Sequence, residues 1–387
     1  MRLRDDLVFP MAEFERRLTD LRARMDEHDL DVMLTTTPEN ICYLSGFDSP
    51  GHWFFNALLV PREGEPVAVP RLLEDSGYEA LTWLEVRRPY SDSENPMERL
   101  NATLQEFGWS DKRIGYEKNC WFFTALQQEQ LFALRPNATF LDCSGIVEAG
   151  RVIKSEYEIE LMRKAARAAE AGMRAGIDAV QAGATDHDVA AEMSHAMIKA
   201  GSEWPSIAPF VAVGERGAIG HATWYGSRIK QGDYVMLEIG GCLKRYHAAM
   251  MRTGFVGEPD ADSRVAEQAV LAAFDAQVAA IRPGVPAEEV HAASARVLAG
   301  VANTLGVKQG SRSGYSIGIG LPPDWGEGQI LSIQPGETRV LQPNMTFHLL
   351  PWVQVPGKAG ISFSETIRVT ENGCETLTNF ERKLFVK

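Results

Sequence analysis

The stretch HATWYGSRIKQGDYVMLEIGGCLKRYHAAMMRT, residues 221–253, contains the pattern that decides the fold. Residues 234–239 are apolar at every position except Glu238, which predicts a buried strand. Gly-Asp before this run and Gly-Gly after it are turn and strand-end signals. A carboxylate inside a buried strand is costly unless it is paired or put to use. Glu238 is therefore either a satisfied core acid or part of a functional site.

The overall composition is that of an ordinary globular protein. The chain has 387 residues, of which 45% are hydrophobic and 24% charged, enough for two or three domains. The net charge of −13 argues against nucleic acid and anionic membranes as partners, since both need basic surfaces. The five cysteines are widely spaced and form no Cys-x-x-Cys pair, which fits reduced thiols. No apolar segment has the length of a signal peptide or membrane span, so we expect a soluble, cytoplasmic protein.

Helix and strand patterns alternate along the first part of the chain, which indicates an α/β domain over residues 1–150. Residues 11–28 carry apolar side chains at helical spacing and predict an amphipathic helix. Short apolar runs at residues 30–35, 57–60 and 66–69 are strand candidates.

The second predicted domain, residues 151–387, begins with a long helix. Ser155 and Glu158 form a capping box at its start, and the helix is expected to end near residue 183. Three further helices are predicted, for residues 185–200, 262–282 and 286–305. Strand and glycine-rich segments lie between the first and second of these three, and others follow the last one to residue 387.

An internal repeat connects the two halves of this second domain. AVQAGATDHDVAAE, starting at Ala179, resembles AIRPGVPAEEVHAA, starting at Ala280. KQGDYVMLE likewise resembles QPNMTFHLL, which sets Glu238 against Leu350. Each half thus consists of two helices followed by a strand. Two such halves predict a pseudo-symmetric sheet with a cleft between them, a favoured place for a small-molecule site.

Six motifs, taken together, resemble a known family: the isolated His221, the strand with Glu238, residues 246–253, GYSIGIG, MTFHLLP and SETIRVTENGCETLT. Residues 151–384 resemble the creatinase, prolidase and aminopeptidase P group, whose catalytic domain has the pita-bread fold. NICYLSGF, residues 40–47, is similar to the creatinase-type N-terminal domain of that group. The resemblance implies an α/β (α+β) chain of two domains, with a pseudo-twofold repeat in the catalytic domain, that forms a homodimer.

The metallopeptidases of this group hold two metal ions with two Asp, one His and two Glu. By the resemblance, those positions fall on Glu238, Ala249, Tyr315, Leu350 and Glu365. Alanine, tyrosine and leucine do not supply the bridging carboxylates that a two-metal site needs. We therefore expect a protein without a metal or other cofactor, and without peptidase activity.

His221, Glu238 and Glu365 remain, and we expect these three residues to be catalytic. Two acids in a cleft suit a cationic substrate, and histidine suits proton transfer. Creatinase is the metal-free precedent in the group, but the Glu of its Leu-Glu-Arg-Thr motif falls on Met251, which favours a different substrate. The resemblance, to which GYSIGIGLPPDWGEG at residues 314–328 also belongs, implies a hydrolase that breaks a C–N bond and opens a small cyclic amidine bearing a carboxylate.

The two carboxylates are expected to clamp the amidinium of that substrate. Either one of them attacks directly, or His221 activates a water molecule as general base. The alternative for His221 is a satisfied core histidine.

Further side chains are expected to contact the substrate, each with a structural alternative. Tyr315 either fills the vacated metal position or hydrogen-bonds the reaction adduct. Arg252 is alternatively a structural ion pair. Trp325 and Trp352 either wall the pocket by cation–π contact or pack in the core. Phe54 or Phe55 either covers the substrate across a dimer interface or has a packing role. The expected substrate-binding residues are Tyr315, Phe54, Phe55, Arg252 and Trp325.

Two rival functions fit the same motifs. The first is a creatinase-like amidinohydrolase of another small substrate. The second is a non-catalytic pita-bread module that binds peptides. The retained His221 argues against the second, because a binding module has no need of a proton-transfer histidine.

Overall fold

The structure is a computed structural model that describes residues 4–306, 308–355 and 359–387. The chain divides into two compact units, Met1–Arg151 and Val152–Lys387. Each unit has its own buried apolar core. Among the described residues, no helix combines the length and the apolar character needed to cross a membrane.

The first unit is built on one six-stranded mixed sheet. Its strands are β1 (Val32–Thr35), β2 (Ala57–Pro61), β3 (Val67–Val69), β4 (Val86–Arg87), β5 (Arg113–Tyr116) and β6 (Thr139–Asp142). Its helices are α1 (Met11–Glu27), α2 (Pro38–Ser45), α3 (Asp75–Leu81), α4 (Pro96–Glu106), α5 (Ala125–Leu134) and α6 (Glu148–Arg151), with short 3-10 turns η1 (Pro50–Trp53) and η2 (Leu72–Glu74).

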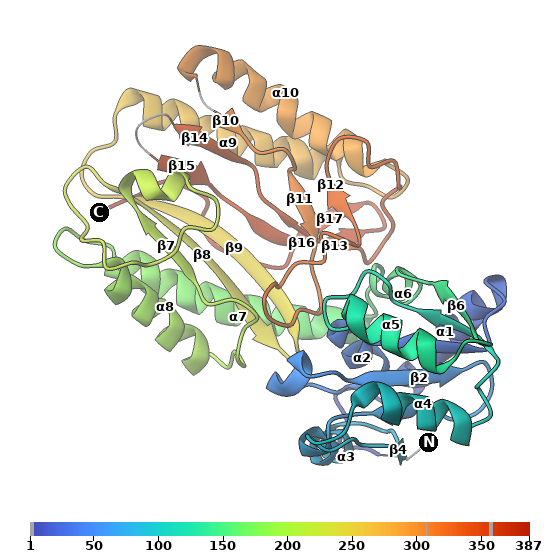
Figure 1. Ribbon diagram of the computed structural model, residues 1–387. Helices are drawn as coiled ribbons and strands as arrows, with labels where there is room; N and C mark the ends of the chain where they lie inside the picture. The colour runs from blue at the N-terminus through green and yellow to red at the C-terminus, as the bar shows by residue number, and fades with distance from the viewer. Residues whose placement is uncertain (1–3, 307, 356–358) are drawn as a thin grey trace. The chain divides into compact units, whose positions relative to one another are not determined.

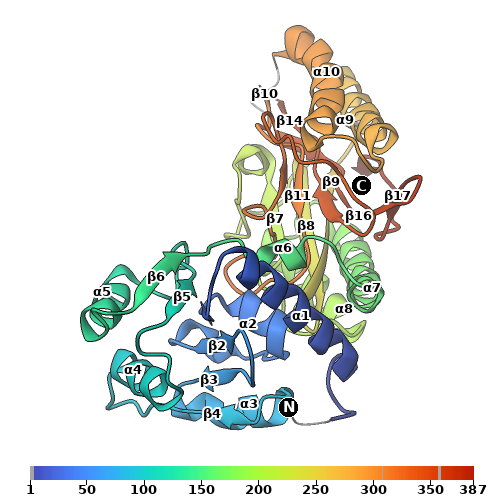
Figure 2. The same ribbon diagram turned by 90° about the vertical axis from the view of Figure 1, so that its right-hand side faces the viewer.

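The strand order of this sheet is β4-β3-β2-β1-β5-β6. β1 is antiparallel to β2 and parallel to β5, so the unit is α/β in character. Within this unit, α4 and α5 lie on one face of the sheet and α1 and α2 on the other (Figures 1 and 2). Met97 and Leu100 of α4 and Leu131 of α5 pack in the core against the strands.

In its described residues, the second unit combines four long helices with three sheets. Its helices are α7 (Glu156–Ala179), α8 (Asp186–Lys199), α9 (Ala261–Ala280) and α10 (Ala287–Leu305), with a 3-10 turn η3 (Gly214–Ala218). Its strands are β7 (Phe210–Val213), β8 (Tyr234–Leu243), β9 (Tyr246–Phe255), β10 (Lys308–Gln309), β11 (Gly314–Ser316), β12 (Ser332–Ile333), β13 (Thr346–Leu349), β14 (Trp352–Val355), β15 (Ala359–Ser362), β16 (Glu365–Thr370), β17 (Gly373–Thr376) and β18 (Phe385–Val386).

Helices and sheets of this unit follow the predicted repeat. α7 and α8 pack on the sheet β18-β9-β8-β7, and α9 packs on β14 and β15 of the sheet β10-β14-β15. The third sheet has the order β12-β11-β13-β16-β17. Figure 1 shows one helix pair beside β8 and β9 and the other beside β14. An isolated bridge between Met251 and Ser364 connects β9 to the segment that leads into β16, so the sheets of the two halves are joined.

The helix starts follow the capping signals in the sequence. The Ser155 side chain accepts from the backbone N–H of Glu158, and the Glu158 side chain accepts from that of Ser155, which completes the predicted capping box of α7. The same arrangement of Thr185 and Asp188 begins α8. The end of α7 differs from the prediction, since the helix stops at Ala179 and residues 180–184 form the turn that leads into α8.

Glycines let β8, the strand that carries Glu238, lie directly against α7. A Cβ added to Gly241 would lie 2.1 Å from the backbone oxygen of Ala165 in α7. On the helix side, a Cβ added to Gly172 would lie 2.5 Å from the side chain of Ile239. Such distances are far below van der Waals contact, so only glycine permits this approach. The depth of β8 in the unit, and with it the position of Glu238, depends on these two residues.

We predict that Gly241→Ala destabilises the protein by about 1–3 kcal/mol, because the new methyl group must displace backbone rather than a flexible side chain. The matched control is Gly300→Ala in α10, where an added Cβ meets nothing within 4 Å. Replacing a helical glycine with alanine at such a site is expected to stabilise by about 0.5–1 kcal/mol. Urea denaturation of both variants measures these changes, and equal effects would contradict the packing argument.

Candidate functional site

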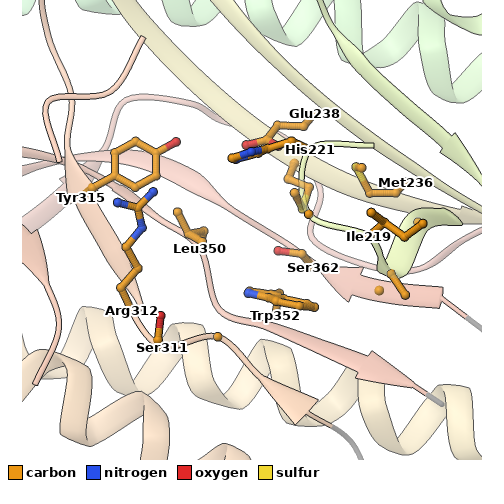
Figure 3. A pocket seen from close by; sticks show the side chains of 16 residues that line it. Ile219, His221, Met236, Glu238, Ser311, Arg312, Tyr315, Leu350, Trp352 and Ser362 are labelled. Carbon is orange, nitrogen blue, oxygen red and sulfur yellow. The ribbon is translucent and has the colours of Figure 1, made fainter. Parts of the chain in front are cut away.

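A pocket of about 290 Å³ lies in the second unit between the strands of its two halves. Met236 and Glu238 reach it from one face of β8, as residues two apart on a strand do. Tyr315 of β11 and Trp352 of β14 reach it from the other half (Figure 3). The lining residues are Gly217, Ala218, Ile219, Gly220, His221, Met236, Glu238, Met251, Gly310, Ser311, Arg312, Tyr315, Leu350, Trp352, Gly360 and Ser362.

Glu238 is the carboxylate that the pocket receives from β8. Burial raises the pKa of its carboxyl group to about 8, and the negative charge of Asp324 adds to the rise, while Arg312 opposes it. At neutral pH most of this carboxyl group is therefore protonated when no ligand is bound. A cation bound next to it favours the ionised form and lowers this pKa again. Glu238 can thus hold a cation or exchange a proton with a ligand.

His221 lies on the loop after η3 and is exposed at the pocket, so it is not a core histidine. Its backbone has a φ of 63°, a left-handed conformation that is uncommon for residues other than glycine. Its ring stacks on Phe210 at a centroid distance of 6.0 Å, and Phe210 is paired with Glu238 across β7 and β8. The structure therefore brings His221 and Glu238 to the same pocket.

Tyr315 has its hydroxyl group in a buried chain of hydrogen bonds. Trp325 donates from Nε1 to the Tyr315 oxygen at 3.0 Å, and His348 Nδ1 lies 2.8 Å from the same oxygen. His348 Nε2 lies 2.7 Å from Ser364 Oγ. Burial lowers the pKa of His348 to about 3 and raises that of Tyr315, so both groups stay uncharged at neutral pH.

The tautomer of His348 sets the direction of the Tyr315 proton. When Nδ1 carries the imidazole hydrogen, Tyr315 accepts from both Trp325 and His348, and its own hydrogen is directed elsewhere. Tyr315 lines the pocket, so that hydrogen can then be donated to a ligand. In that tautomer, the position that the resemblance assigns to a metal ligand carries a neutral hydrogen-bond donor.

Glu365, which we expected beside Glu238 as a second catalytic carboxylate, lies outside the pocket lining and is fully buried. Its Oε1 accepts from Arg252 at 2.5 Å and lies 3.4 Å from Arg382. Its Oε2 accepts from the Thr378 hydroxyl at 2.5 Å. Arg252 also donates to the backbone oxygens of Ser364 and of the C-terminal segment. Arg252 therefore has the structural role that was the alternative to substrate binding. It forms a buried ion pair with Glu365.

The aromatic residues that we expected to contact the substrate lie in both units. Trp325 is buried behind Tyr315, and Trp352 lines the pocket. Phe55 belongs to the core of the first unit, where it packs near Tyr90. Phe54 of the same unit is 43% exposed, and the Arg71 guanidinium lies 4.0 Å from its ring centroid. Packing therefore accounts for Phe55, whereas Phe54 has the accessible ring that a contact with another molecule needs.

The donor set does not fit a two-metal site. Glu238 and Glu365 are the carboxylates at the five positions considered, and both oxygens of Glu365 already have protein partners. Ala249 is buried in β9 and offers no side-chain donor. Within the part of the chain that the structure describes, no group of three or more His, Cys, Asp and Glu side chains is placed to hold a metal ion. These residues lack the oxygen donors that two hard cations require.

Several pocket residues were not predicted from the sequence. Arg312 and Ser311 belong to a short loop without periodicity, and Ile219 precedes His221 in another loop. His348 stood in a quoted motif, but nothing in the sequence showed that it contacts Tyr315. The repeat was the available signal for Leu350, because it aligns that residue with Glu238, and both line the pocket.

Comparison with known proteins identifies the family. Residues 160–371 match the model of metallopeptidase family M24, and residues 17–153 match the creatinase/prolidase N-terminal domain. The chain belongs to metallopeptidase family M24. The fold class predicted from the sequence is thereby confirmed, with a creatinase-type N-terminal domain and an M24 pita-bread domain.

Relatives of this M24 chain include small-molecule and peptide hydrolases by name. It is 32% identical to a protein named ectoine hydrolase from Halomonas elongata, over 98% of this chain and 99% of that protein. It is 31% identical to an uncharacterized hydrolase/peptidase from Sinorhizobium fredii, over 98% and 99%. Family and relatives support a hydrolase.

Solved M24 structures share the fold over nearly the whole chain. Dipeptidase PepE from Mycobacterium ulcerans has a TM-score of 0.82 and 25% identity, covering 98% of this chain and 99% of its own. The prolidase from Pyrococcus horikoshii has a TM-score of 0.83 and 23% identity, covering 96% and 100%. The homodimer and the cytoplasmic location stay predictions.

We predict that Glu365→Gln destabilises the protein by about 3–5 kcal/mol, because it leaves the buried Arg252 without its counter-charge. The matched control is Glu238→Gln, the same substitution at a carboxylate to which the described part of the chain gives no such partner. Urea denaturation at neutral pH measures both. A Glu365→Gln protein as stable as the wild type would show that the ion pair contributes nothing to the fold.

The raised pKa of Glu238 makes a prediction about pH. The folded protein keeps the proton up to about pH 8, whereas the unfolded chain releases it near the ordinary value of 4.5, so folding is increasingly disfavoured between these values. Glu238→Gln removes this penalty. Its thermal stability relative to the wild type is therefore expected to increase from pH 5 to pH 8, and a difference independent of pH would contradict the assignment.

Proposed function

We propose that this protein is a metal-independent hydrolase that opens the ring of ectoine, a cyclic amidine with a carboxylate, to N-acetyl-2,4-diaminobutyrate. The observation that carries the proposal is the combination of Glu238, His221 and Tyr315 on one small pocket in a chain similar to an ectoine hydrolase. The cavity of about 290 Å³ is just below the range typical of small-molecule sites, about 300–1,000 Å³, and suits a small ligand.

The pocket residues can divide the chemistry of ring opening among them. The Glu238 carboxylate accepts an N–H of the amidinium, whose positive charge favours the ionised acid. His221 takes a proton from water, and the hydroxide adds to the central amidine carbon. The Tyr315 hydroxyl donates to the resulting tetrahedral adduct.

Collapse of the adduct completes the reaction. The imidazolium of His221 returns its proton to one ring nitrogen, and the bond between that nitrogen and the central carbon breaks. The adduct hydroxyl becomes the carbonyl of the acetamide, and its proton passes through Glu238 to the released amine. Water and amidinium are thus converted into an amide and an ammonium group, with all protons accounted for.

A parallel assay tests the proposal. Purified, chelator-treated protein is incubated with ectoine, creatine and an Xaa-Pro dipeptide, and products are separated by chromatography. We expect a ring-opened product from ectoine alone. Cleavage of the dipeptide that depends on added Mn²⁺ would contradict the proposal, as would turnover of creatine without turnover of ectoine.

The pH profile assigns the role of Glu238. Because the ionised form binds the amidinium, kcat/KM is expected to rise with pH and to reach half of its maximum near the pKa of the free protein, about 8. Glu238→Gln should lower kcat/KM by about 100-fold or more and abolish this rise. A Glu238→Gln enzyme with unchanged turnover would rule out this role.

A further inference from the structure

Arg312 brings a positive charge to the pocket. It lies two residues before β11, on the side of the pocket formed by the second half of the unit. Its guanidinium carbon is 4.5 Å from the ring centroid of Tyr315, a cation–π contact that fixes the side chain beside the proposed hydrogen-bond donor. Figure 3 shows Arg312 next to Tyr315, with His221 and Glu238 on the other side of the pocket.

The residues that the structure describes leave the charge of Arg312 without an ion-pair partner. Within residues 4–306, 308–355 and 359–387, no hydrogen bond or ion pair joins the Arg312 guanidinium to another side chain, and Arg312 is exposed at the pocket. Other arginines of the same unit are engaged: Arg252 binds Glu365, and Arg245 donates to Ser206 and to the backbone oxygen of Trp204. Arg312 is therefore a lining cation that is available to a ligand.

A glycine provides the space that the Arg312 guanidinium occupies. A Cβ added to Gly328 would lie 2.9 Å from Nη1 of Arg312, so the lack of a side chain at this residue leaves room for the guanidinium. The charge of Arg312 is also felt across the pocket, since it opposes the rise in the pKa of Glu238. The pocket thus presents a guanidinium on one side and a titratable carboxyl group on the other.

We propose that Arg312 binds the carboxylate of the substrate and thereby selects zwitterionic amidines over amidines without an acidic group. This assignment rests on the proposed ring-opening function. A guanidinium donates two parallel N–H groups to a carboxylate, which fixes the orientation of the ligand as well as its charge. With the carboxylate on Arg312 and the amidinium on Glu238, the central carbon of the ring lies between them, where His221 and Tyr315 reach it.

The test compares ectoine with its decarboxylated analogue, 2-methyl-1,4,5,6-tetrahydropyrimidine, as substrates of three proteins. In Arg312→Gln we expect kcat/KM for ectoine to fall about 10- to 100-fold, the loss typical of a charged hydrogen-bonding group, with no change for the analogue. Arg312→Lys keeps the charge but loses the paired donors, so we expect an intermediate value. The control is Arg296→Gln, at an exposed arginine of α10 outside the pocket, which should match the wild type on both substrates.

Binding of the same two compounds, measured by calorimetry, separates this inference from the proposed function. Ectoine binding that depends on Arg312, without ring opening, would refute the reaction and support the carboxylate site. Ring opening with equal losses on both compounds in Arg312→Gln, or with no loss, would refute the carboxylate site and keep the reaction. If ectoine neither binds nor reacts, both proposals are wrong.

Discussion

The buried ion pair between Arg252 and Glu365 is the interaction on which the arrangement of the second unit depends. Both side chains are fully buried, so neither charge is solvated by water, and each must be satisfied by the protein. Arg252 meets this demand by donating to backbone oxygens from three separate segments, at Met251, at Ser364 and at Phe380 and Glu381 near the C-terminus. Because β9 belongs to one half of the unit and β16 to the other, this pair ties the halves together close to the pocket.

The same residue type has opposite roles at two positions that the family resemblance treats alike. Glu365 is surrounded by donors, and its carboxylate is locked in place. Among the residues that the structure describes, none donates a hydrogen bond to Glu238, and burial keeps its carboxyl group largely protonated at neutral pH. An acid with satisfied oxygens supports the scaffold, whereas an acid without them is able to bind a ligand or exchange a proton. Environment, rather than residue identity, separates structure from chemistry here.

The sequence predicted what local patterns determine. The apolar run around Glu238 became β8, which extends to Leu243 because the following glycines continue the strand instead of ending it. The capping box at Ser155 began α7, and the repeat gave the two halves. Contacts between distant segments were not predictable: Thr378 and Arg382 reach Glu365, and His348 reaches Tyr315, only after the chain has folded. Arg312 was not predicted, because an exposed loop arginine has no distinguishing pattern in a single sequence.

The protonated state of Glu238 has a consequence for the competition between inorganic cations and organic ligands. A neutral carboxyl group exerts little pull on sodium or potassium, so these ions do not compete for the pocket even when they are abundant. A basic organic ligand that fits the cavity can instead take up the proton of Glu238. The resulting carboxylate then holds the protonated ligand. Glu238 thus discriminates against inorganic cations by remaining uncharged until a basic ligand is bound.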